Sequence, residues 1–115
     1  MKKTIRMLGV LITTSLVANA ANAAGETGEV NVTQVKVSTS YTQVFFENTA
    51  NNPDSCANTS SVVVEATHAA KREIYSSAMA ALNARLPANF DIDGCSTLTG
   101  GPSVPVVTAI TVGAQ

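Results

Sequence analysis

The spacing of apolar residues changes twice along this chain, and this change constrains the fold more than any other feature of the sequence. Between residues 29 and 67, apolar and polar side chains alternate in short runs, which is typical of β-strands. Between residues 68 and 86, apolar residues recur with the period of an α-helix, and alternation then returns. The pattern predicts a mainly β fold with one helix, in the order β-β-β-α-β-β.

The first predicted strand, residues 29–39, is long and changes phase. Its apolar residues share one face at the start and the other face toward the end, so we expect a bulge or bend near Gln34. Residues 41–47 follow closely enough to pair with it as a hairpin. The three consecutive valines within residues 61–67 predict a third strand.

The predicted helix spans residues 68–86, a segment rich in strong helix formers. Thr67 is its predicted N-cap, and Pro87 ends the run. One face of this helix carries small and apolar residues, so we expect it to lie close against a sheet. Residues 88–95 and 104–112 alternate again and predict the last two strands.

This order of elements matches a five-stranded Greek-key barrel of the OB type, in which the helix lies between the third and fourth strands. An open antiparallel sheet covered by one helix is the structural alternative. Both arrangements place the helix against the apolar face of the sheet, so the sequence predicts one hydrophobic core.

The first 23 residues have the composition of a bacterial export signal. A positively charged start precedes an apolar stretch that is too short to serve as a mature membrane helix. Two Ala-x-Ala sites allow cleavage after Ala23, which we favour, or after Ala20. We therefore predict a signal peptide at 1–23 and a single OB-like domain at 24–115, periplasmic or secreted and without a membrane anchor.

The charge of the mature chain argues against a nucleic-acid partner. The whole chain has 7 basic and 8 acidic residues, and three of the basic ones lie in the signal. Four basic residues then remain against eight acidic ones, so the mature chain is net negative. A net negative surface repels phosphate backbones and anionic membranes.

Cys56 and Cys95 are the two cysteines of the chain. An even number of cysteines in an oxidising compartment predicts a disulfide. A redox-active pair is the alternative, but such pairs usually lie close together in the sequence, as in Cys-x-x-Cys. The loop that this bond would close predicts a stabilisation of about 4 kcal/mol.

Residues suited to catalysis or metal binding are scarce. His68 is the one histidine, and the predicted helix start places it where the dipole disfavours imidazolium. Asp91 and Asp93 are similar to part of a calcium loop, but the remaining acidic positions are missing. We therefore predict no catalytic residues, no metal ligands and no cofactor.

Side chains suited to ligand binding gather where the first hairpin would turn. Ser38 and Ser40 supply hydroxyl groups, and Tyr41 supplies a ring. Sugars are bound by hydroxyl hydrogen bonds and by ring stacking. An ordinary strand and turn have the same composition, so both interpretations stay open.

Four short runs of residues have a familiar spacing. They are Asp54-Ser55-Cys56, Ser61-Val62-Val63-Val64, Ala70-Lys71-x-x-Ile74-Tyr75-Ser76, and Phe90-x-Ile92-x-Gly94-Cys95. Over about residues 29–112 the chain resembles small exported bacterial proteins, which in turn resemble the B subunits of subtilase-cytotoxin-like and pertussis-like toxins. The resemblance implies an OB-type fold, a ring of five subunits and a sialoglycan-binding face.

The same resemblance places a sugar-contacting serine of those subunits near Gly28 of this chain. Thr27 is the hydroxyl neighbour of that position, so it joins Ser38, Ser40 and Tyr41 as a candidate ligand-binding residue. The sequence thus predicts a non-enzymatic binding domain that resembles a toxin B subunit, with a glycan or a protein as its partner. The alternative is a periplasmic inhibitor or immunity protein that acts through an exposed loop, residues 48–60 or 96–103.

Overall fold

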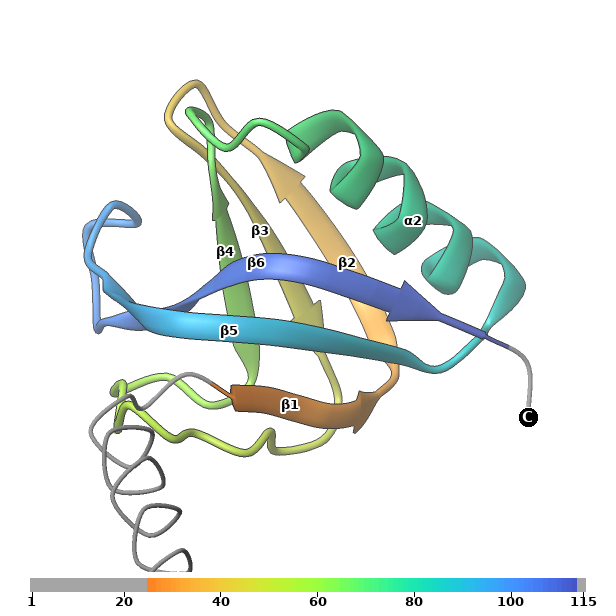
Figure 1. Ribbon diagram of the computed structural model, residues 1–115, viewed down its shortest axis with the longest axis horizontal. Helices are drawn as coiled ribbons and strands as arrows, with labels where there is room; N and C mark the ends of the chain where they lie inside the picture. Colours follow the sequence, from red (N-terminus) through yellow and green to blue (C-terminus); the bar gives the residue numbers. More distant parts are fainter. Residues whose placement is uncertain (1–24, 114–115) are drawn as a thin grey trace, which may run out of the picture.

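The computed structural model describes residues 25–113 (Figure 1). It is mainly β with one helix and one disulfide, as the sequence predicts. The predicted signal peptide, residues 1–23, lies outside the described residues. The elements are β1 (Gly25–Val30), β2 (Val32–Val37), β3 (Tyr41–Phe46), β4 (Ser61–Glu65), α2 (Lys71–Ala84), β5 (Ala88–Ser96) and β6 (Val104–Val112).

The prediction of five strands is wrong by one, because the long first strand is two strands. β1 and β2 are separated by the exposed Asn31. β1 pairs with β5, whereas β2 pairs with β3, so the chain bends where it changes partner. The phase change near Gln34 is present as an irregular register between Val32 and Gln34 in the β2–β3 ladder.

The six strands form one sheet in the order β1-β5-β6-β4-β3-β2. All neighbours are antiparallel except β4 and β6, which run parallel and meet at Val63 and Val106. The strands at the two edges, β1 and β2, are consecutive in the chain. The two edges of the sheet therefore come together at Asn31, and the sheet curls around its own core (Figure 1).

The core lies inside this curl. Phe90 of β5 is fully buried there, and its ring centroid lies 6.4 Å from that of Phe46. The helix closes the core with the small-residue face that the sequence predicts, and the buried residues of that face are Ile74, Ala78 and Ala81. Small side chains allow the helix to approach the strands closely, which fixes its position over β2 and β6.

The helix begins later than the sequence predicts, and Thr67 is not its N-cap. Ala70 occupies the cap position without a side-chain hydrogen bond. The imidazole of His68 instead accepts a hydrogen bond from the backbone N–H of Ala70 through Nδ1, at 3.0 Å. This local bond holds residues 68–70 in a turn, so the helix starts at Lys71.

The outer edge of β1 is covered by the chain that follows β3. The backbone N–H of Asn51 donates to the carbonyl of Thr27 at 3.0 Å. The side-chain amide of Asn48 donates to the carbonyl of Glu29 at 3.1 Å. These bonds occupy polar groups of an edge strand that could otherwise pair with another chain.

The predicted disulfide is confirmed. It joins Cys56 in the loop after β3 to Cys95 near the end of β5, with a Cα–Cα distance of 5.6 Å. Asn52 holds the same loop by accepting a hydrogen bond from the N–H of Cys56 and donating one to its carbonyl. Asp54 accepts a hydrogen bond from the N–H of Gly94 at 2.6 Å.

Candidate functional site

A groove of about 270 Å³ lies between the β2–β3 turn and the N-terminal end of α2. We call it the hairpin groove. It combines apolar, hydroxyl and cationic side chains from three separate parts of the chain. Its lining residues are Val37, Ser38, Thr39, Tyr41, Thr42, Val64, Ala66, Lys71, Arg72 and Tyr75.

Two backbone hydrogen bonds hold the β2–β3 turn beside the helix. The N–H of Ser38 donates to the carbonyl of Tyr41 at 2.8 Å and closes the turn. The N–H of Ala66, just after β4, donates to the carbonyl of Ser40 at 3.0 Å. The turn is therefore attached to the segment that leads into α2, and both walls of the groove belong to one connected unit.

The groove exposes apolar surface. Val37 is 63% exposed and Tyr75 is 38% exposed. Among the described residues, only three large hydrophobic side chains are exposed, and these are two of them. Apolar groups gathered at one place on a surface are typical of interaction sites.

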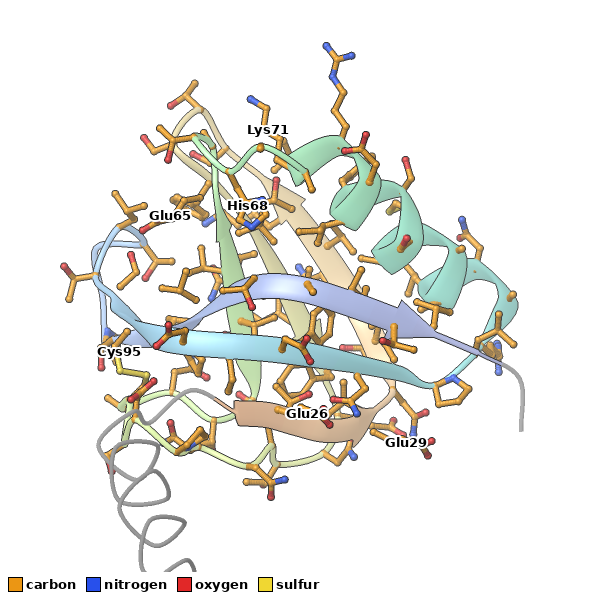
Figure 2. The ribbon with its side chains drawn as sticks, viewed as in Figure 1. Glu26, Glu29, Glu65, His68, Lys71 and Cys95 are labelled. Carbon is orange, nitrogen blue, oxygen red and sulfur yellow. A yellow bond between two sulfur atoms is a disulfide. The ribbon has the colours of Figure 1, made fainter. Side chains whose placement is uncertain are left out.

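The helix end adds positive charge to this apolar surface. Lys71 and Arg72 are exposed in the first turn of α2, and Figure 2 shows Lys71 at this end of the molecule. The N-terminus of a helix already carries a partial positive charge, and each cation there is disfavoured by about 0.3–1 kcal/mol. Glu73 in the same turn is acidic but does not line the groove, whereas Lys71 and Arg72 do, so the lining at this end attracts an anion.

Two of the four predicted ligand-binding residues, Ser38 and Tyr41, line the hairpin groove, and Ser40 lies beside it in the exposed turn. The Tyr41 ring is only 8% exposed, because it packs with Val63 and Val104. The Lys36 ammonium lies 5.7 Å from its centroid. Tyr41 therefore offers little ring surface for stacking, and Tyr75 is the exposed aromatic residue.

Thr27 lies on β1, away from the other three candidates. It is 3% exposed, and its hydroxyl donates to the carbonyl of Gly28 at 2.7 Å and accepts from the N–H of Phe90 at 3.1 Å. Both hydrogen-bonding functions of the hydroxyl are thus used within the protein. Thr27 fastens β1 to β5 and does not line the hairpin groove.

Sequence reasoning missed Val37, Lys71, Arg72 and Tyr75 as groove residues. Tyr75 directly follows the buried Ile74, so helical periodicity places it at the margin of the apolar face and does not mark it as a binding residue. The adjacent Lys71 and Arg72 at a helix start without an acidic N-cap are the sequence signal that could have drawn attention to this end.

Two further observations concern residues 25–113 as described. They contain no group of three or more His, Cys, Asp or Glu side chains arranged to hold a metal ion. No helix among them has both the length and the apolar composition needed to cross a membrane. Asp91 and Asp93 are exposed on β5, on the opposite side of the strand from the buried Ile92.

No protein-family model, curated protein or solved structure matches this chain. The hairpin groove is therefore interpreted from its own chemistry. That chemistry consists of an exposed aromatic ring, hydroxyl groups on a turn held by backbone hydrogen bonds, and two cationic side chains at the start of a helix.

Proposed function

We propose that this chain is an exported, non-enzymatic binding domain of the OB type, which binds an anionic glycan in the hairpin groove. The observation that carries the proposal is the presence of the exposed Tyr75 ring, the hydroxyls of Ser38 and Thr39, and two cations in one groove. A ring stacks on the apolar face of a sugar, hydroxyls bond to its polar edge, and cations attract a carboxylate.

The strand order supports the OB assignment. In an OB barrel the long first strand pairs through its two halves with different neighbours, and the helix precedes the fourth strand. Here β1 and β2 act as the two halves, and α2 lies between β4 and β5. The parallel contact between β4 and β6 joins the β1-β5-β6 half of the sheet to the β4-β3-β2 half, and an open antiparallel sheet has no such pair.

Export is supported by the disulfide between Cys56 and Cys95, because such bonds persist in oxidising compartments. The size of the groove, about 270 Å³, favours weak binding by a single copy. Weak sites become effective when several copies act together, so a ring of subunits, five by the toxin resemblance, would suit this function.

The proposal is tested by titrating the isotopically labelled mature chain, residues 24–115, with a sialylated oligosaccharide and with its neutral, desialylated counterpart. We expect NMR shifts at groove residues and tighter binding of the sialylated form. Tyr75→Ala should weaken binding about fivefold through loss of the ring. Arg72→Gln should weaken it about two- to fivefold and reduce the preference for the sialylated form.

Arg85→Gln is the matched control, because it removes the same charge from the opposite end of α2. It should leave glycan affinity unchanged. Equal losses in Arg72→Gln and Arg85→Gln would reveal a general charge effect, and the absence of groove shifts with both sugars would overturn the proposal. Light scattering of the mature chain tests the ring separately: a monomer at all concentrations would exclude it.

A second candidate function, an inhibitor or immunity protein, is favoured by one observation on the loop between β5 and β6. Leu98 is 46% exposed in this loop. The loop is held at its base, because the backbone of Ser103 accepts from Asn58 at 2.8 Å and its hydroxyl accepts from Ala57 at 2.9 Å. A held loop with an apolar tip can enter a partner's pocket at low entropic cost.

To distinguish this alternative from glycan binding, the chain is tested as an inhibitor of a panel of periplasmic hydrolases. Inhibition of one of them by the wild-type chain and by Tyr75→Ala, but not by Leu98→Asp, would favour the inhibitor function over the glycan-binding function. Inhibition that survives Leu98→Asp would exclude this loop as its cause.

A further inference from the structure

A second and larger pocket, of about 370 Å³, lies at the other end of α2. We call it the helix-end pocket. It is bounded by the C-terminal turn of the helix on one side and by the junction of β1 and β2 on the other. Since α2 has 14 residues, a rise of 1.5 Å per residue places this pocket about 20 Å from the hairpin groove.

The helix side of the pocket carries a guanidinium group on an unusual backbone position. α2 ends at Ala84, and Arg85 adopts the left-handed conformation with φ of 56°. The backbone N–H groups of Arg85 and Leu86 both donate to the carbonyl of Ala81, and the helix ends there. Glycine or asparagine is the usual residue at such a position, because each adopts the left-handed conformation at low cost. Here the position is occupied by Arg85, which brings a long cationic side chain to the pocket.

The strand side of the pocket carries a carboxylate that is held in place. The N–H of Glu47 donates to the carbonyl of Asn31 at 3.2 Å. The side-chain amide of Asn31 donates to Oε2 of Glu47 at 3.3 Å. The end of β3 is thereby fastened to the β1–β2 junction, and a negative charge is presented to the pocket from this side.

Between these two charges the lining of the pocket is mixed, because Asn31 and Thr33 lie beside apolar side chains. Val32 is buried, and Leu82 and Leu86 are half-buried and line the same pocket. The volume of the pocket lies within the usual range of small-molecule sites, and the half-buried Leu82 and Leu86 offer a ligand apolar surface.

We propose that the helix-end pocket is a second ligand site, which binds a small apolar zwitterion such as an amino acid or a short peptide with free ends. The ammonium group of the ligand meets Glu47, its carboxylate meets Arg85, and its apolar side chain lies against Leu82 and Leu86. A guanidinium can bind a carboxylate through two parallel hydrogen bonds, which gives directional recognition of that group. This site does not depend on the glycan-binding function.

Three probes that share one apolar side chain but differ in their charged groups test the contribution of each charge separately. They are L-leucine, leucinamide, which lacks the carboxylate, and 4-methylpentanoate, which lacks the ammonium. In NMR titrations of the labelled mature chain, we expect shifts at Val32, Leu82 and Leu86. Leucine should bind about two- to fivefold more tightly than either analogue, as expected for exposed charge pairs.

Two variants assign each charge to one end of the ligand. Arg85→Gly suits the left-handed backbone and should fold normally. It should abolish the preference for leucine over leucinamide and keep the preference over 4-methylpentanoate. Glu47→Gln retains an oxygen that can accept the Asn31 hydrogen bond, and it should show the opposite pattern.

Tyr75→Ala, in the hairpin groove, is the control and should leave leucine binding unchanged. Leucyl-leucine distinguishes a peptide ligand from a free amino acid. Tighter binding of leucyl-leucine than of leucine favours a peptide, and weaker binding favours a free amino acid. Equal affinity for all three probes, shifts outside the pocket, or preferences that survive both charge variants would each overturn the proposal.

Discussion

The loop end of the molecule and the groove end are held together in different ways. The loop end contains the segment after β3 and the β5–β6 loop, and it is tied by the Cys56–Cys95 disulfide and by side-chain bonds from Asn52 and Asp54. The groove end lies at the opposite end of β3, where the β2–β3 turn meets the start of α2 (Figure 1). There, backbone bonds hold the turn, and Val37 remains largely exposed.

The difference follows from composition. The loop after β3 is rich in Asn, Thr and Ser, so it buries little apolar surface and depends on covalent and polar ties. The groove end leaves apolar side chains in contact with water, although burial would stabilise them. Stability is therefore concentrated at one end, and surface suited to a ligand at the other.

The largest effect on stability is expected when the disulfide at the loop end is removed. Replacing Cys56 and Cys95 together by serine should lower the free energy of unfolding by about 4 kcal/mol, because the unfolded chain gains the entropy that the bond removed. Urea denaturation of residues 24–115 measures this loss. An unchanged midpoint would show that the polar bonds alone hold this end.

A smaller loss of stability is expected when the hydrogen bonds of the loop end are removed. Asn52→Ala removes two hydrogen bonds to the backbone of Cys56 and should cost about 1–2 kcal/mol by urea denaturation. Asn52→Asp is the matched control, since it keeps the acceptor for the Cys56 N–H and loses only the donor. It should lie between the wild type and Asn52→Ala; equal stabilities of all three would contradict a role for this residue.

The smallest effect is expected at the groove end. Val37→Thr keeps the branched shape at a position that is 63% exposed, so thermal unfolding should show a change below about 0.5 kcal/mol. Val44→Thr makes the same substitution at a fully buried position of β3 and should cost about 1–3 kcal/mol. Similar losses in both variants would show that Val37 contributes to stability as a core valine does, and would contradict its free exposure in the groove.

Much of the fold could be predicted from the sequence because its elements are locally encoded. The limits of β6 were predicted correctly, and those of β5 to within one residue, since strict alternation marks both strands. The start of α2 was predicted three residues too early, because the hydrogen bond from Ala70 to His68 competes with helix formation there. The split at Asn31 was missed as well, because a phase change does not reveal that two halves of a strand choose different partners.

The candidate site was predicted less well, and the two tyrosines show why. Both tyrosines line the hairpin groove, yet Tyr41 is covered by Val63 and Val104, whereas Tyr75 is exposed. Thr27 shows the same limit, because its burial depends on the pairing of β1 with β5.

The sequence by itself determined most of the elements, their order and the two residues of the disulfide, because periodicity, turn residues and cysteine number act over short distances or by count. The split of the first strand at Asn31 was decided by strand pairing. The tertiary structure decided which side chains share a surface. Val37 and Arg72 meet in one groove, and Glu47 and Arg85 in one pocket, only because the sheet curls until its edges join and α2 docks across it. That arrangement depends on the packing of the whole core, which no single segment encodes.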